Sequence, residues 1–177
     1  MRKILSFDAE SNGLWGEAFA IGALVYDDRG IEIARFIGRL SDAVVTNEWV
    51  KKNVLPQLTE VLVTHHDYES LLSDFAKFYM MHKLDADIVV HGGLPVEVKI
   101  IIDMHTRGFI GDWEHPFPLH DVASYLVQVG EDPILIDSYV RKHKISIADD
   151  FNGSTHNPLY DSEVAARVFM HLRRRIQ

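Results

Sequence analysis

Residues 4–40 contain three apolar segments of strand character, and the short connections between them restrict how this chain can fold. The segments are Ile4–Glu10, Ala18–Tyr26 and Ile31–Leu40. Asn12-Gly13 follows the first segment and Asp27–Gly30 follows the second, and both are turn signals. Connections this short join neighbouring antiparallel strands, whereas a parallel pair needs a long crossover. The chain is therefore expected to begin with an antiparallel three-strand meander.

Beyond residue 40 the pattern changes to helices that alternate with strands. Apolar residues at spacings of three and four, with helix stop signals, predict the helices. The expected helices are Asn47–Leu55, Tyr68–Lys83, one opened by Gly92–Pro95, Ala123–Val129, Asp137–His143 and Asp161–Arg175, with strands at Asp85–His91 and Leu119–Val122 and a loop at Phe151–Pro158. This order predicts an α/β fold with a mixed sheet. No repeat or linker divides the chain, so residues 1–177 are expected to form a single domain.

Composition narrows the class of protein without deciding its partner. The chain has no cysteine, which excludes disulfides and thiolate metal sites and is compatible with a reducing cytoplasm. The apolar run before Asp8 is too short for a signal peptide, and no segment approaches membrane-spanning length. A cytoplasmic protein without a membrane partner is the simplest interpretation. The net charge of −8 favours neither the presence nor the absence of nucleic-acid binding.

Two carboxylates lie where the first strand leaves its apolar run. Asp8 and Glu10 are two residues apart, so in a strand their side chains point to the same face. Adjacent carboxylates repel each other, and a bound divalent cation removes that cost. Oxygen ligands of this kind suit Mg²⁺ or Mn²⁺. The alternative is a solvated pair at a strand end.

A second pair of polar residues, His156 and Asp161, lies near the end of the chain. His156 falls in a Gly/Asn/Ser/Thr-rich loop, and Asp161 falls at the start of an amphipathic helix, where a carboxylate is favourable. Taken alone, Asp161 can be a helix cap and His156 a loop histidine. The spacing H-x(4)-D gains meaning because a D-x-E strand opens the same chain.

Together the two stretches resemble a known family of nucleases. F-D-A-E-S-N-G-L at the first strand and H-N-P-L-Y-D-S-E-V-A-A at the last helix resemble the first and third motifs of the DEDD exonuclease superfamily. The histidine spacing is that of the DEDDh branch, which includes ribonuclease T, oligoribonuclease and the proofreading subunit of the bacterial replicative polymerase. The resemblance implies a ribonuclease H-like fold, which agrees with the expected order of elements.

The resemblance also assigns site residues. It implies that Asp8 and Glu10 of the first motif and His156 and Asp161 of the third are catalytic. The middle motif usually reads H-N-x-x-F-D, but His91–Glu97 here lacks its Asn, Phe and Asp. Glu97, one residue beyond the expected position, is the nearest carboxylate and is taken as the fourth metal ligand. Asp103 is the next candidate and fits less well, while His91 is expected to be structural or to support the metal ligands from behind, and not to be catalytic.

The activity implied by this resemblance is hydrolysis of phosphodiester bonds at the 3′ end of single-stranded RNA or DNA. Two Mg²⁺ or Mn²⁺ ions would be held by Asp8, Glu10, Glu97 and Asp161, and His156 would be the general base. The terminal nucleotide would bind Asn12, Gly13, Leu14 and Trp15; the alternative is that Leu14 and Trp15 only cover an edge of the core. Some relatives are dimers, so a homodimer stays open.

Two other functions are compatible with parts of the sequence. The altered middle motif allows a nucleic-acid-binding or regulatory module on the same fold with a weakened active site. A phosphatase with an Asp nucleophile fits less well, because it needs a second Asp where this chain has Glu10 and a strand-helix-strand order where this chain has a meander. Asp121 is expected to cap the helix that follows it, and the alternative is a place at the edge of the active site.

Overall fold

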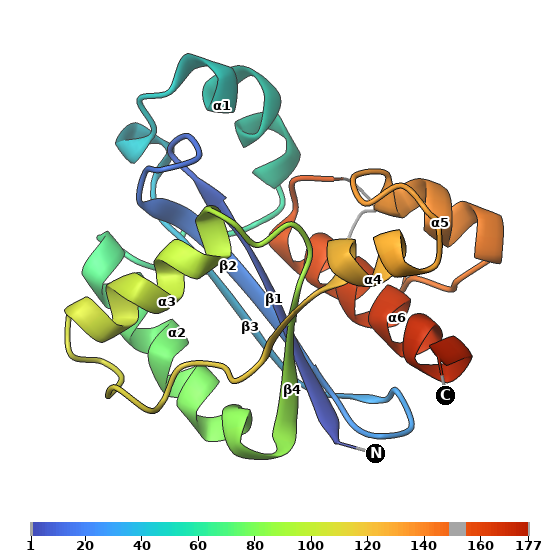
Figure 1. The fold of residues 1–177 in the computed structure, drawn as a ribbon. Helices are drawn as coiled ribbons and strands as arrows, with labels where there is room; N and C mark the ends of the chain where they lie inside the picture. The colour runs from blue at the N-terminus through green and yellow to red at the C-terminus, as the bar shows by residue number, and fades with distance from the viewer. Residues whose placement is uncertain (1, 149–154, 177) are drawn as a thin grey trace.

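The computed structural model describes residues 2–148 and 155–176 (Figure 1). Its centre is a five-stranded sheet with the order β3-β2-β1-β4-β5. The strands are β1 (Lys3–Ser11), β2 (Ala18–Tyr26), β3 (Glu32–Arg39), β4 (Ala86–Val90) and β5 (Leu119–Asp121). The first three pair antiparallel, while β4 pairs parallel with both β1 and β5. This confirms the expected α/β fold with an antiparallel meander and a mixed sheet.

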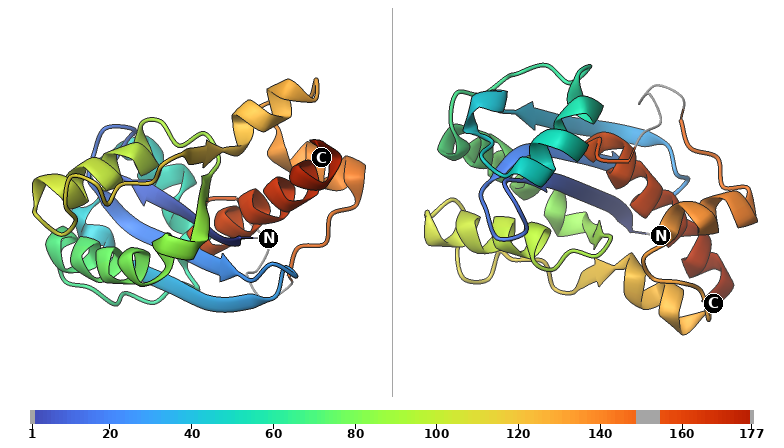
Figure 2. Two further views of the ribbon diagram at one scale, coloured as in Figure 1. Left: turned by 60° about the horizontal axis from the view of Figure 1, so that its bottom comes forward. Right: turned by 90° about the horizontal axis from the view of Figure 1, so that it is seen from above.

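Helices cover both faces of the sheet. The helices are α1 (Glu48–Asn53), α2 (Tyr68–His82), α3 (Val96–Thr106), α4 (Val122–Gln128), α5 (Ile136–His143) and α6 (Pro158–Ile176), with short 3₁₀ turns at Asp42–Val44, Leu55–Leu58 and Lys83–Asp85. In Figures 1 and 2, α2 and α3 lie on one face and α4, α5 and α6 on the other, while α1 lies beyond the end of β1. Two apolar clusters result, one on each face of the sheet.

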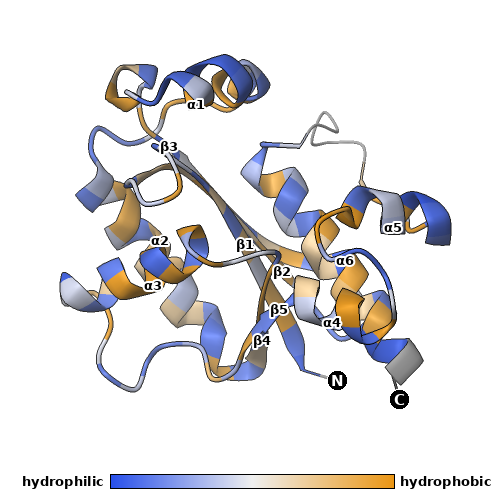
Figure 3. Ribbon diagram, turned by 45° about the horizontal axis from the view of Figure 1, so that its top comes forward, coloured by the Kyte–Doolittle hydropathy of each residue, from blue (hydrophilic) through white to orange (hydrophobic). Residues whose placement is uncertain are grey.

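The apolar pattern explains this layering. Every residue of β2 is buried, as expected for a strand covered on both faces. Helix α2 buries Leu71, Leu72 and Phe75 on the face that meets the sheet. Figure 3 shows helices that carry both apolar and polar stretches around the central strands. Among the residues described, no helix is both long enough and apolar enough to cross a membrane.

The largest error in the expected boundaries concerns α6. The helix begins at Pro158, three residues before the predicted start at Asp161. The Asn157 side chain accepts a hydrogen bond from the Leu159 N–H at 3.1 Å, and Pro158 suits the first helical position because the N–H it lacks has no helical partner there. Asp161 therefore lies within the first turn of the helix and does not cap it. Residues 151–154 of the loop predicted at Phe151–Pro158 lie outside the described residues.

The other boundary errors are small. Helix α1 ends at Asn53, and a 3₁₀ turn follows where the sequence predicted continued helix to Leu55. Helix α3 begins at Val96, directly after Pro95. The strands are within a residue or two of their predicted limits, so none of these differences moves a candidate site residue to another element.

Candidate active site

Three carboxylates from the two ends of the chain meet at the end of β1. Oxygen atoms of Asp8, Glu10 and Asp161 all lie within 4.8 Å of one another. Asp8 and Glu10 share one face of β1, as their spacing predicted, and Asp161 comes from the first turn of α6. Three carboxylate oxygens at this separation are a donor set that suits a hard divalent cation.

Close packing between α6 and β2 places Asp161 beside β1. Gly22 of β2 is the cross-strand partner of Asp8. A Cβ atom at Gly22 would lie 2.5 Å from the backbone carbon of Pro158, so only glycine lets the helix approach this closely. The Ser162 hydroxyl donates a hydrogen bond to the Gly22 carbonyl at 3.0 Å. The start of α6 is thus fixed against the strand that neighbours Asp8.

The carboxylates of this cluster are costly to ionise without a cation. Burial, followed by the charges of Asp161, Glu97 and Glu10, raises the pKa of Asp8 well above its usual range. Burial and the charge of Glu10 raise the pKa of Asp161 to about 8. Desolvation and like charge both disfavour the ionised forms, and a bound divalent cation would reverse both effects.

Glu97 lies in the first turn of α3, on the opposite side of β1 from α6. Its side chain is buried, and Oε1 accepts a hydrogen bond from the Ala9 N–H at 3.1 Å. Burial raises the pKa of Glu97 to about 8. Glu97, Asp8, Glu10 and Asp161 line one cleft of about 320 Å³, although Glu97 is not part of the close three-carboxylate cluster. Its role as the fourth ligand stays a prediction.

Asp103, the second candidate for the fourth ligand, is engaged elsewhere. Its Oδ2 accepts hydrogen bonds from the Tyr68 hydroxyl at 2.7 Å and from the Lys99 ammonium at 2.6 Å. A carboxylate neutralised by a lysine on its own helix has little negative charge left for a metal ion. The geometry therefore favours Glu97 over Asp103.

Asp121 and His91 hold the turn between β4 and α3. The Asp121 carboxylate accepts the Ala123 N–H at 3.0 Å, which confirms its predicted capping of α4. It also accepts the N–H groups of Gly92 at 2.9 Å and Gly93 at 3.1 Å. The His91 Nε2 lies 2.7 Å from the Pro133 carbonyl, so His91 makes a structural contact, as expected. These bonds fix the turn that precedes Glu97.

His156 lies at the edge of the carboxylate cluster in a left-handed backbone conformation, with φ of 71°. Its N–H donates to Asp161 Oδ2 at 2.8 Å, and its Nδ1 lies 3.5 Å from Glu10 Oε1. The contact with Glu10 raises the pKa of His156. Nε2 makes no hydrogen bond within residues 2–148 and 155–176, and the side chain is 40% exposed. The imidazole can therefore meet a ligand in the cleft.

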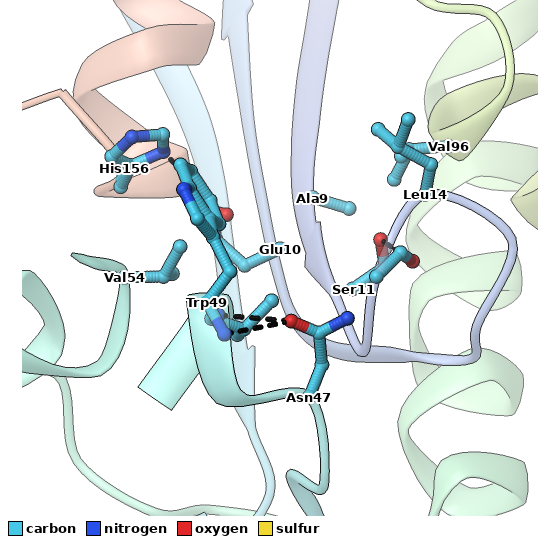
Figure 4. Close-up of a pocket in the computed structure, with 11 residues that line it drawn as sticks. Ala9, Glu10, Ser11, Leu14, Asn47, Trp49, Val54, Val96 and His156 are labelled. Atoms are coloured by element: carbon cyan, nitrogen blue, oxygen red, sulfur yellow. Dashed lines mark hydrogen bonds and ion pairs between the residues drawn. The ribbon is translucent and has the colours of Figure 1, made fainter. Parts of the chain in front are cut away.

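An apolar cavity of about 460 Å³ adjoins the cluster (Figure 4). Its walls include Gly13 and Leu14 of the loop after β1, Val54 and Val96, the edge of His156, and Trp49 of α1. Trp49 was not among the predicted site residues, because the signal that marks it, a tryptophan that stays 60% exposed, is visible only in the structure.

The four predicted substrate-binding residues have different surroundings. Gly13 and Leu14 line the cavity, whereas Trp15 does not line it and is 74% exposed. Leu14 is also mostly exposed, so neither side chain covers a core edge. The Asn12 side chain accepts the N–H groups of Thr46 at 3.0 Å and Asn47 at 2.9 Å. Asn12 therefore ties the loop to the segment before α1.

Known proteins resemble this chain in fold but not closely in sequence. No family model matches the chain, and no curated protein matches it either. Among solved structures, the fold is similar to that of exonuclease X in complex with 5′ overhanging duplex DNA, with a TM-score of 0.60 over 99% of this chain and 92% of that chain. The two sequences are 15% identical. The likeness confirms a ribonuclease H-like fold for this chain.

Proposed function

We propose that this protein is a metal-dependent 3′-to-5′ exonuclease of the DEDDh type. The observation that carries the proposal is the meeting of Asp8, Glu10 and Asp161 within 4.8 Å, with His156 at their edge. These four residues come from the two sequence stretches that resemble the exonuclease motifs. The likeness in fold to a DNA-bound exonuclease supports nucleic acid as the substrate class.

Asp8, Glu10, Glu97 and Asp161 would hold the metal ions. Two Mg²⁺ or Mn²⁺ ions in such a site would neutralise charge on the phosphate and lower the pKa of the attacking water. The protein's own part is to present four carboxylates from β1, α3 and α6 in a partly buried cleft. The raised pKa values of Asp161 and Glu97 support this fit, because the ionised cluster is unstable without a cation.

His156 is proposed as the general base. With Nδ1 directed toward Glu10, Nε2 is the ring nitrogen left to accept a proton from a water molecule in the cleft that His156 lines. The Asp161 carboxylate accepts a hydrogen bond from the His156 N–H, which fixes the backbone of the proposed base relative to the carboxylates. A histidine suits this role because its ordinary pKa lies near neutral pH.

The 3′-terminal nucleoside is proposed to occupy the apolar cavity. Leu14 and Trp49 offer apolar and aromatic surface that accepts any base, and the backbone at Gly13 can approach the sugar closely. Trp15, which is exposed and follows Leu14 in the chain, can stack on an unpaired base further along the strand, which favours single-stranded ends. Asn12 is proposed to shape the loop that carries Gly13 and Leu14, because its side chain accepts hydrogen bonds from the N–H groups of Thr46 and Asn47.

Incubation of 5′-labelled single strands of RNA and of DNA with Mg²⁺ or Mn²⁺ tests the proposal. We expect a ladder of products that shorten from the 3′ end, and no ladder with Asp8→Asn, which removes one ligand charge. Exposed Glu60→Gln is the matched control and should retain full activity. Products that shorten from the 5′ end, or internal cuts, would contradict the proposed direction.

The second candidate is a nucleic-acid-binding module, which the altered middle motif at His91–Glu97 favours. A gel shift retained without cleavage in either metal would select that alternative. The cytoplasmic location and the homodimer stay predictions, and the mass in solution tests the latter.

A further inference from the structure

The indole of Trp49 forms part of the wall of the apolar cavity and also contacts His156 (Figure 4). The ring centroids of Trp49 and His156 are 5.9 Å apart, and the ring planes meet at 85°, an edge-to-face contact. One side chain therefore touches both the space proposed for the terminal nucleoside and the proposed base.

His156 needs support from outside its own segment. Its Nδ1 is 3.5 Å from Glu10 Oε1, a separation at the limit of a hydrogen bond, so this contact alone fixes the ring weakly. The backbone bond to Asp161 fixes the main chain but leaves the side-chain torsions free. The indole of Trp49 is the aromatic contact that restricts the imidazole.

Trp49 is itself held in place through the loop that follows β1. Helix α1 has six residues, which is too short to be stable by itself. The Asn47 side chain caps it by accepting the N–H groups of Trp49 at 3.0 Å and Val50 at 3.1 Å. Asn12, two residues after Glu10, accepts the Asn47 N–H at 2.9 Å. Hydrogen bonds thus connect the strand that carries Glu10 to the helix that carries Trp49.

We propose that Trp49 is a positioning residue that couples occupancy of the cavity to the placement of His156. This proposal rests on the proposed exonuclease function. A terminal base in the cavity packs against the indole and presses it against the imidazole, so His156 is held in place when a complete nucleotide is bound. A strand without its terminal base leaves the indole less restrained. Aromatic contacts of this kind correspond to rate effects of about 2- to 10-fold.

Steady-state kinetics test the coupling. The substrates are one strand with an ordinary 3′ nucleotide and one with an abasic 3′ residue. We expect loss of the base to lower the kcat of the wild type, and Trp49→Ala to lower kcat by about 2- to 10-fold and abolish this sensitivity to the base. Trp49→Phe should restore most of the rate, because it keeps an aromatic ring. Trp113→Phe, a change at a residue that is 91% exposed, is the matched control.

Two kinetic results would overturn the proposal. One is a raised KM with unchanged kcat in Trp49→Ala, which would make Trp49 a cavity wall only. The other is additivity with His156→Ala, because two residues that act through one contact should show no further loss of kcat when both are changed.

Fluorescence separates a failure of this proposal from a failure of the exonuclease function. The chain has three tryptophans, so Trp15→Phe with Trp113→Phe leaves Trp49 as the only indole. Addition of His156→Ala should change the emission of Trp49, and adenosine monophosphate with Mn²⁺ should also change it. If no strand is cleaved but both changes occur, the coupling stands and the exonuclease function fails. Emission that is unaltered by His156→Ala overturns the positioning role, whatever the activity.

Discussion

Glu97→Gln should make the metal-free protein lose less stability as the pH rises from 4.5 to 7.5. The pKa of Glu97 is raised from 4.5 to about 8 by burial, so the folded protein keeps this carboxyl protonated across a range in which the unfolded chain ionises it. Below pH 4.5 both states are protonated and the group costs nothing. As pH rises toward 8, the unfolded state gains from ionisation and the folded state does not, so stability falls.

The size of the effect follows from the pH interval. Between pH 4.5 and 7.5, a carboxyl that ionises only in the unfolded state destabilises the fold by about 1.4 kcal/mol for each pH unit, or about 4 kcal/mol in all. Glutamine keeps the acceptor for the Ala9 N–H but buries an amide NH₂ without an evident partner, at a cost of about 1–3 kcal/mol. That cost does not vary with pH. The pH-dependent part of the difference between the two proteins is therefore the quantity to measure.

Urea unfolding in EDTA at pH 4.5 and pH 7.5 provides the assay. The free energy of unfolding of Glu97→Gln minus that of the wild type should be about 4 kcal/mol larger at pH 7.5 than at pH 4.5, which means that the variant gains stability relative to the wild type. Exposed Glu60→Gln should show no such change. Mn²⁺ at pH 7.5 should stabilise the wild type more than the variant. A pH-dependent difference below about 1 kcal/mol would refute the inference that Glu97 holds a proton in the folded state.

Three further substitutions test the supports of the site. Gly22→Ala should destabilise the fold by at least about 1–3 kcal/mol, measured by urea unfolding, because its Cβ would meet the backbone of Pro158; an unchanged midpoint would contradict the close packing. Asp121→Ala should cost about 1–3 kcal/mol by thermal unfolding and lower activity, since it releases Gly92, Gly93 and Ala123 N–H groups together. His156→Ala should reduce turnover by about 10²- to 10⁴-fold while Mn²⁺ still binds in calorimetry; full turnover would exclude His156 as the base.

Local patterns predicted the fold well. The meander followed from three apolar segments and their turn residues, and the same-face placement of Asp8 and Glu10 followed from the period of a strand. The predicted start of α6 was wrong by three residues, because Asn157 caps the helix and Pro158 is its first residue. The prediction placed the start of the helix at the Asp161 carboxylate, whereas the Asn157-Pro158 pair that precedes it begins the helix.

Contacts between distant residues could not be read from spacing. Asp121 holds the N–H groups of two glycines that lie 28 and 29 residues before it, and nothing in the local sequence relates them. The contact of Trp49 with His156 joins residues that are adjacent only because α1 and α6 both reach the end of β1. Such contacts depend on the relative placement of whole elements, which local propensity does not encode.

The middle of the site shows where the shifted carboxylate of Glu97 lies. Asp121 and His91 fix the turn between β4 and α3, so the backbone before Glu97 cannot slide along the strand. A side chain one residue beyond the expected position must then reach back toward β1, and glutamate has one methylene more than aspartate for that purpose. Its Oε1 reaches the Ala9 N–H, between Asp8 and Glu10. The longer side chain and the fixed turn together keep a carboxylate in the cleft that Asp8, Glu10 and Asp161 line, despite the departure from the H-N-x-x-F-D pattern.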